Sequence, residues 1–178
     1  MGAGAPPNHH QVLNSSDSQA ISIVTRASSQ STFCVPQGGP LPVLTPSGKR
    51  ANRIAREFDP PAQKWLAGHR GIDIDAPAHS KVLAPVNGTV KFVGKVAGKS
   101  EVSFSAFSDD TVIFSFEPAQ TRLHVGDSLT KGEPLATVQG ESDHCADTCV
   151  HWGARRNGVY VDPRTALDPV RIILKPVE

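Results

Sequence analysis

Val102-Ser-Phe-Ser-Ala-Phe-Ser-Asp-Asp-Thr-Val-Ile-Phe-Ser-Phe116 contains two runs in which apolar and polar residues alternate. Alternation with a period of two places successive side chains on opposite faces of a strand, so each run is expected to bury one face. The polar Ser108-Asp-Asp110 between the runs predicts a turn. We therefore predict a β-hairpin here, with Phe104 and Phe114 directed into the core.

Shorter segments rich in β-forming residues continue this pattern on both sides of the hairpin. Asn87-Gly88 is a strong two-residue hairpin signal and predicts a turn between neighbouring strands. Gly126-Asp127 and Asn157-Gly158 predict two further turns. Strands at this spacing without intervening helices are typical of an all-β domain, and we predict an antiparallel β-sandwich or barrel-like core. The other predicted strands cover Val82–Ala84, Thr89–Val93, Pro134–Val138, Val150–Ala154 and Val159–Val161.

The part of the chain before this regular pattern differs in composition. Residues 1–33 are rich in Ser, Gln, Ala and Asn, and we expect a flexible tail there. Residues 34–178 are expected to form one β domain that begins with an irregular arm rich in turn-forming Pro and Gly. Within this arm, two apolar residues at helical spacing allow a short helix over Lys49–Phe58, whereas Arg56–Asp59 is equally compatible with a strand.

Length, charge and hydropathy exclude several classes of protein. The 178 residues carry 18 basic and 17 acidic side chains, a net charge of +1, which argues against a nucleic-acid partner because such proteins usually have a basic excess. No apolar run approaches the roughly 20 residues that a membrane-spanning helix needs. The N-terminus also lacks the basic start and apolar centre of a signal peptide, so we expect any leader to be absent from this chain.

Two short stretches, His69-Arg-Gly-Ile-Asp73 and Cys149-Val-His-Trp-Gly153, carry potential metal ligands. The Gly in the first stretch and a nearby Pro argue against a helix there, so we expect an extended chain. Residues two and four apart in an extended chain share a face, so His69 and Asp73 point the same way. Together with His151 from a neighbouring strand, they offer two imidazoles and one carboxylate, the composition of an open zinc site.

The motif His69-Arg-Gly-Ile-Asp73 is followed in chain order by Lys81-Val-Leu-Ala-Pro-Val-Asn-Gly-Thr-Val90, Val125-Gly-Asp-Ser-Leu-Thr-Lys-Gly-Glu-Pro-Leu-Ala136, Val150-His-Trp-Gly-Ala-Arg155 and Tyr160-Val-Asp-Pro163. This order resembles the LytM/lysostaphin-type (M23) zinc endopeptidases. The resemblance implies an all-β M23 core over about 58–167 and one zinc ion held by His69, Asp73 and His151. It also implies export to the bacterial cell envelope or the extracellular space, and peptidoglycan or a cell-wall hydrolase as the partner.

The sequence departs from that family at both of its catalytic imidazoles. The family ends in a His-x-His motif whose first His is catalytic, and Cys149 stands in that place here. A second catalytic His normally precedes the Val-Gly-Asp turn, and counting back from that turn reaches Glu117. We therefore expect weak or lost endopeptidase activity. The alternative is an active zinc endopeptidase in which Glu117 is the base, and a solvated Glu117 without a role is a further possibility.

Three interpretations are open for Cys149: a disulfide with Cys145, a fourth zinc ligand, or a thiolate nucleophile. We favour the disulfide, because three intervening residues keep the two sulfur atoms close in almost any turn. Cys34 is then left over. His144, beside Cys145, either reaches the site from its loop or lies on the surface.

Overall fold

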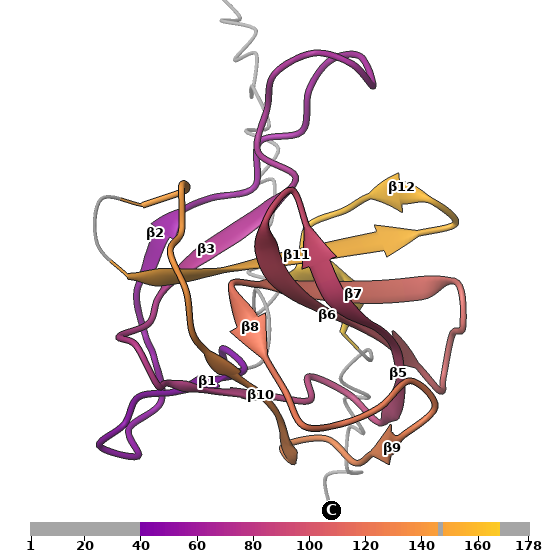
Figure 1. Ribbon diagram of the computed structural model, residues 1–178. Helices are drawn as coiled ribbons and strands as arrows, with labels where there is room; N and C mark the ends of the chain where they lie inside the picture. Colours follow the sequence, from indigo (N-terminus) through magenta and orange to yellow (C-terminus); the bar gives the residue numbers. More distant parts are fainter. Residues whose placement is uncertain (1–39, 146–147, 168–178) are drawn as a thin grey trace, which may run out of the picture. The chain divides into compact units, whose positions relative to one another are not determined.

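Two antiparallel β-sheets form the structure, a computed structural model in which residues 40–145 and 148–167 are described (Figure 1). The predicted all-β fold is confirmed, and the one helical segment among the described residues is the short 3-10 helix η1 (Pro163–Ala166). No helix in this part of the chain is long and apolar enough to cross a membrane. The larger sheet has the order β2 (Ile54–Arg56), β3 (Gly71–Asp75), β11 (Cys149–Arg156), β7 (Val112–Glu117), β6 (Lys99–Ala106), β5 (Gly88–Val96) and β9 (Ser128–Leu129), with β12 (Val159–Tyr160) beside β11. The smaller sheet has the order β1 (Val43–Leu44), β4 (Lys81–Leu83), β10 (Pro134–Val138) and β8 (Ala119–Gln120).

The core lies between the two sheets and depends on the alternation seen in the sequence. Every second residue of β7 is buried, and the predicted hairpin is present as the pair β6–β7, in which Phe104 faces Phe114. The indole of Trp152 from β11 stacks on Phe116, with ring centroids 6.0 Å apart. Side chains of the smaller sheet, such as Leu135, belong to the same apolar cluster. Burial of these apolar side chains stabilises the packing of one sheet on the other.

The hairpin turn predicted at Asn87-Gly88 is wrong. The chain crosses there from the smaller sheet to the larger one, so β4 and β5 do not pair. A Cβ atom at Gly88 would collide with the backbone oxygen of Ser105 on β6, which shows that glycine is needed for close strand packing. The turn that joins β5 to β6 lies at Ala97-Gly98, where both residues have the positive φ of a primed hairpin turn (+49° and +86°).

The arm before β3 contains strands and no helix in its described part. The short helix over Lys49–Phe58 is not formed, and the strand in this segment is β2 (Ile54–Arg56), which overlaps the predicted strand Arg56–Asp59 only at Arg56. Pairing with β3 sets this conformation, because Ile54 lies opposite Ile74 and its side chain packs against the core. The predicted flexible tail, residues 1–33, lies outside the described residues, as does Cys34.

The outer face of the larger sheet, which points away from the core, carries the polar residues singled out in the sequence. On β3, Ile72 and Ile74 are part of the core while Asp73 between them faces outward. The register places Asp73 opposite His151 on β11 and His151 opposite Glu117 on β7. One row across three neighbouring strands therefore brings together two carboxylates and an imidazole that are far apart in sequence.

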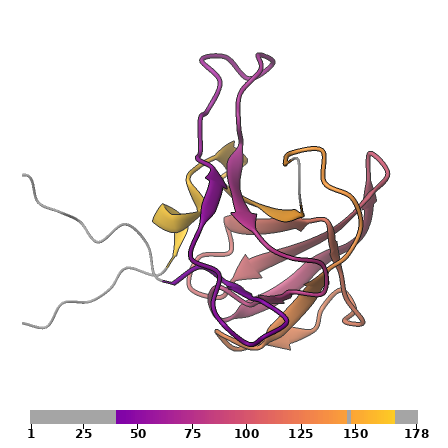
Figure 2. The ribbon, with the colours of Figure 1, turned by 90° about the vertical axis from the view of Figure 1, so that its left-hand side faces the viewer.

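Gly71, at the start of β3, makes room for this row. The loop between β2 and β3 projects away from the sheets and returns to them at this glycine (Figure 2). A Cβ atom at Gly71 would lie 2.7 Å from Nε2 of His151 and would also collide with the backbone oxygen of Trp152. Only glycine lets β3 approach β11 this closely with the imidazole between them.

Gly71→Ala is expected to reduce the free energy of unfolding by about 1–3 kcal/mol, because the backbone of β11 cannot move away from the new methyl group. The imidazole of His151 should also be displaced. Gly94→Ala on β5 is the matched control, since its methyl group would meet only the ring of Phe92, which is partly exposed and free to rotate. Urea unfolding and NMR spectra of the imidazole nitrogens measure both effects. Equal behaviour of the two variants would contradict this role for Gly71.

Candidate metal centre

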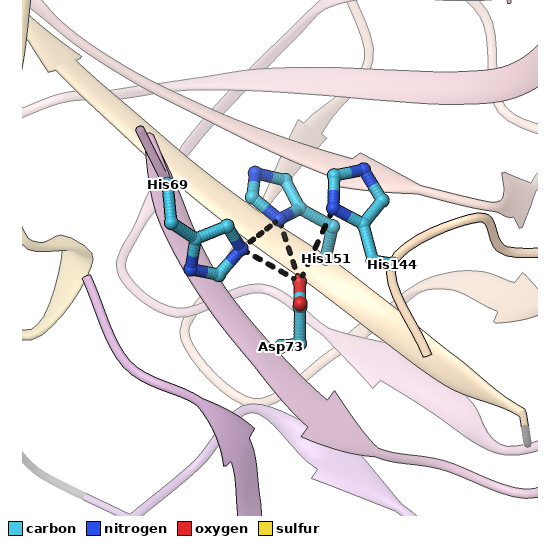
Figure 3. Close-up of side chains that lie close together, drawn as sticks. All are labelled: His69, Asp73, His144 and His151. Carbon is cyan, nitrogen blue, oxygen red and sulfur yellow. Dashed lines mark hydrogen bonds and ion pairs between the residues drawn. The ribbon is translucent and has the colours of Figure 1, made fainter. Parts of the chain in front are cut away.

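Four side chains converge on the outer face of the larger sheet (Figure 3). Asp73 comes from β3 and His151 from β11, whereas His69 and His144 come from the segments that lead into these two strands. His69 is fixed by paired backbone hydrogen bonds with Asp59, of 2.7 and 2.9 Å. The structure thus brings together the three residues predicted as metal ligands and adds a third imidazole.

The carboxylate of Asp73 is the centre of this cluster. Its Oδ1 lies 2.7 Å from Nδ1 of His151 and 3.1 Å from Nε2 of His69, and these two nitrogens are 3.2 Å apart. Asp73 is completely buried, and its Oδ2 has no hydrogen-bond partner among the described residues. A buried carboxylate oxygen without a partner is costly, which points to a ligand that supplies positive charge.

The orientation of His69 strengthens this argument. Its Nδ1 donates a hydrogen bond to the backbone carbonyl of Glu57 at 2.6 Å, and a carbonyl only accepts. In the neutral imidazole, Nε2 is then an acceptor, and it faces the carboxylate of Asp73. Two acceptors 3 Å apart repel each other unless a cation or a proton lies between them. A backbone carbonyl on the outer nitrogen is also the usual way in which proteins orient a metal-binding His.

The spacing of the donor atoms suits a small divalent cation such as zinc. Zinc binds imidazole nitrogen at about 2.0–2.1 Å, so two ligands at tetrahedral positions lie about 3.3 Å apart. The separations of 2.7–3.2 Å among His69, Asp73 and His151 are close to that value. Two imidazoles and one carboxylate also match the ligand set of open zinc sites. These residues therefore fit the metal that the family resemblance implies.

His144 joins the cluster from the loop before β11. Its ring stacks on His151 with centroids 4.6 Å apart, and its Nδ1 lies 3.8 Å from Oδ1 of Asp73. The other nitrogen, Nε2, lies 3.1 Å from the carboxylate of Glu117. From the sequence, His144 could either reach the site or lie on the surface. The alternation that fixes the direction of side chains in a strand does not apply to a residue in a loop.

Electrostatic interactions within the cluster favour its charged forms. Burial by itself raises the pKa of Asp73, but the hydrogen bond from His151 and the charges of the three imidazoles hold this pKa below its ordinary value. The hydrogen bond with Glu117 raises the pKa of His144. The same hydrogen bond, assisted by the charge of Lys99, lowers the pKa of Glu117. Glu117 is therefore ionised at neutral pH.

The remaining predicted site residue, Cys149, is joined to Cys145 in a disulfide. In this form its sulfur offers no thiolate to a metal ion or a substrate. Its Sγ also lies 3.3 Å from Oγ of Ser142, which accepts a hydrogen bond from the backbone N–H of His144. The disulfide and Ser142 together attach the loop that carries His144 to the first residue of β11.

Comparisons with known proteins agree with this fold. The model of Peptidase family M23 matches residues 67–163. The uncharacterized protein Rv2891 of Mycobacterium tuberculosis is 31% identical over 129 residues, which cover 70% of this chain and 51% of that protein. The chain thus spans about half the length of this relative.

Two solved structures share the fold at low sequence identity. Csd3 of Helicobacter pylori has a TM-score of 0.55 and 18% identity, and the match covers 79% of this chain and 35% of that one. A zinc-containing peptidase of Vibrio cholerae has a TM-score of 0.52 and 16% identity, with 70% and 39% covered. The family match spans more than half of the 178 residues and confirms the resemblance inferred from the motifs, so the chain belongs to peptidase family M23.

Proposed function

We propose that this chain is a cell-envelope M23 domain that binds one zinc ion through His69, Asp73 and His151 and has weak or no endopeptidase activity. The observation that carries the proposal is that nitrogens of His69 and His151 both face Oδ1 of the buried Asp73, at 3.1 and 2.7 Å, while its Oδ2 has no hydrogen-bond partner among the described residues. Cys149 and Glu117 stand where the motif resemblance expects catalytic imidazoles. Its partner is peptidoglycan or a cell-wall hydrolase that it binds.

Support for the zinc ion comes from the donor atoms and their surroundings. His69 and His151 present nitrogen atoms to the carboxylate of Asp73, and Glu57 fixes the outer nitrogen of His69. Zinc bound there would polarise a peptide carbonyl and lower the pKa of a water molecule. The Vibrio cholerae structure of the same fold is described as that of a zinc-containing peptidase.

The proposed weak activity is explained by the residues Glu117 and Cys149, which stand where the family has catalytic imidazoles. Peptide hydrolysis needs a group that donates a hydrogen bond to the oxyanion, and an ionised Glu117 only accepts. Cys149 is held in a disulfide and donates nothing. Removal of one oxyanion donor typically costs about 10²–10³ in rate, or about 2.7–4 kcal/mol in the barrier. Loss of both family imidazoles therefore accounts for a domain that binds its target and turns it over poorly.

A second candidate function is an active zinc endopeptidase with Glu117 as the base. One observation favours it: Glu117 is ionised and belongs to the same cross-strand row as His151. An ionised carboxylate beside a zinc site is a workable proton acceptor. In this case Glu117 would be essential for turnover.

The disulfide supports a location outside the cytoplasm. Disulfides persist in oxidising compartments and are rare in the reducing cytosol. Cys145 and Cys149 close a short loop next to the site, where the bond holds functional residues in place. Export also gives the domain access to peptidoglycan, the partner that the family resemblance implies.

Zinc binding is tested with two Asp→Asn variants on the same strand. Asp73→Asn is expected to reduce zinc affinity by at least about 100-fold, because it removes the charge at the centre of the site. Asp75→Asn, two residues further along β3, should bind like the wild-type chain, since Asp75 pairs with Arg53 at the surface. Titration against a chromophoric chelator measures both affinities, and circular dichroism verifies the fold. A wild-type chain that holds no zinc would refute the metal site and leave only a binding surface.

Endopeptidase activity is tested by incubating the zinc-loaded chain with purified peptidoglycan. We expect the chain to sediment with peptidoglycan, or to bind a hydrolase partner, and to release no more new amino termini than a chelator-treated sample. Robust turnover that Glu117→Gln abolishes, and that the control Glu101→Gln on β6 retains, would favour the active endopeptidase instead. Quantifying free amino groups over time distinguishes the two outcomes.

A further inference from the structure

His144 has the same arrangement around its ring as His69. The outer nitrogen of each imidazole meets a group that only accepts hydrogen bonds, the backbone carbonyl of Glu57 for His69 and the carboxylate of Glu117 for His144. The inner nitrogen of each faces the carboxylate of Asp73. In both neutral rings the proton therefore belongs on the outer nitrogen, and the inner nitrogen directs a lone pair at the same point.

Glu117 is held in the position that this arrangement needs. Its side chain extends from the end of β7, is largely buried, and lies 3.8 Å from Nζ of Lys99. Lys99 also makes a 2.7 Å ion pair with Asp143, the residue before His144. The strand that supplies Glu117 and the loop that supplies His144 are thus linked through the same lysine.

We propose that His144 is a fourth protein ligand of the metal, through Nδ1, and that Glu117 is the positioning residue that orients it. This inference rests on the proposed zinc site. The ligand atoms of His69, Asp73, His144 and His151 all lie within 4.8 Å of one another. Since tetrahedral zinc ligands are about 3.3 Å apart, a movement of about 1.5 Å or less brings His144 into place.

The loop that carries His144 is restrained in a way that suits a ligand. The disulfide between Cys145 and Cys149 joins the neighbouring residue to β11, and Ser142 accepts a hydrogen bond from the backbone of His144. The imidazole itself lies flat against His151, with an angle of 22° between the rings. A restrained side chain loses little conformational entropy when it binds a metal.

Four protein ligands would leave zinc without an open coordination position. Sites of this kind are structural, whereas catalytic zinc sites keep one position for water or substrate. The closed site would also give Glu117 a role other than that of a base, because no coordination position would remain for a water molecule that it could deprotonate. Weak activity then has a cause in the ligand set itself, in addition to the missing imidazoles.

Cobalt substitution of the full chain tests the fourth ligand directly. In the wild-type chain, the visible spectrum of bound Co²⁺ should be that of a four-coordinate site and should not change on addition of azide. His144→Ala should make the spectrum sensitive to azide and lower the zinc affinity by about tenfold or more. His124→Ala, which removes an exposed imidazole from another loop, should change neither property.

Two substitutions of Glu117 test its positioning role. Glu117→Ala should lower the zinc affinity about tenfold, because Nε2 of His144 loses its nearer and less exposed outer partner and keeps only the exposed carboxylate of Asp143, at 3.4 Å. Glu117→Gln keeps a carbonyl oxygen that accepts the same hydrogen bond, so it should retain most of the affinity. Comparable losses in both variants would show that the charge of Glu117 matters and would overturn this role.

These experiments distinguish failure of the fourth-ligand proposal from failure of the proposed three-ligand zinc site. Zinc binding that His144→Ala leaves unchanged, with a wild-type cobalt spectrum that responds to azide, would overturn the fourth ligand while the three-ligand site stands. A wild-type chain that binds neither metal would overturn both proposals. Binding that requires Asp73 and is weakened by His144→Ala, with the azide response confined to that variant, would support both.

Discussion

The buried carboxylate of Asp73 is the constraint around which the outer face of this domain is organised. It is fully excluded from solvent, one of its oxygens has no partner among the described residues, and imidazole nitrogens of His69 and His151 converge on the other. Such an arrangement is unfavourable by itself and becomes favourable when a cation is bound. The pairing of β3 with β11, the glycine at position 71 and the anchoring of His69 all serve to hold these groups together despite their mutual repulsion.

Alternation of side chains along β7 and β11 places core residues on one face of the larger sheet and site residues on the other. Trp152 and Phe116 face the core, and their sequence neighbours His151 and Glu117 face outward in register with each other. A shift of one residue in the pairing of β11 would place the imidazole in the core and the indole at the site. The apolar core therefore fixes the register, and the register fixes the site. A core mutation that shifted this register would therefore also disrupt the site.

Strand parity explains how much of this was predictable from the sequence. The period of two along residues 102–116 correctly predicts the central hairpin, and parity places His69 and Asp73 on one face. The predicted hairpin turn at Asn87-Gly88 is wrong because the chain crosses there from one sheet to the other. The two-residue turn motif cannot indicate such a crossing, which depends on tertiary packing. The sequence left two directions open for His144 for a related reason: the direction of a loop side chain depends on long-range contacts, here with Glu117 and His151.

The contact between His144 and Glu117 is the point at which the candidate functions diverge. Glu117 acts as a base only if its carboxylate accepts a proton from a water molecule, whereas it acts as a positioning residue through Oε1, which lies 3.1 Å from Nε2 of His144. The same contact turns the inner nitrogen of His144 toward Asp73. Under the proposed four-ligand site, this hydrogen bond would orient a further donor atom toward the metal. In this proposal Cys149 and Glu117, which the motif resemblance places at the family's catalytic positions, would act together: the disulfide of Cys149 would restrain the loop, and Glu117 would orient the histidine that the loop carries.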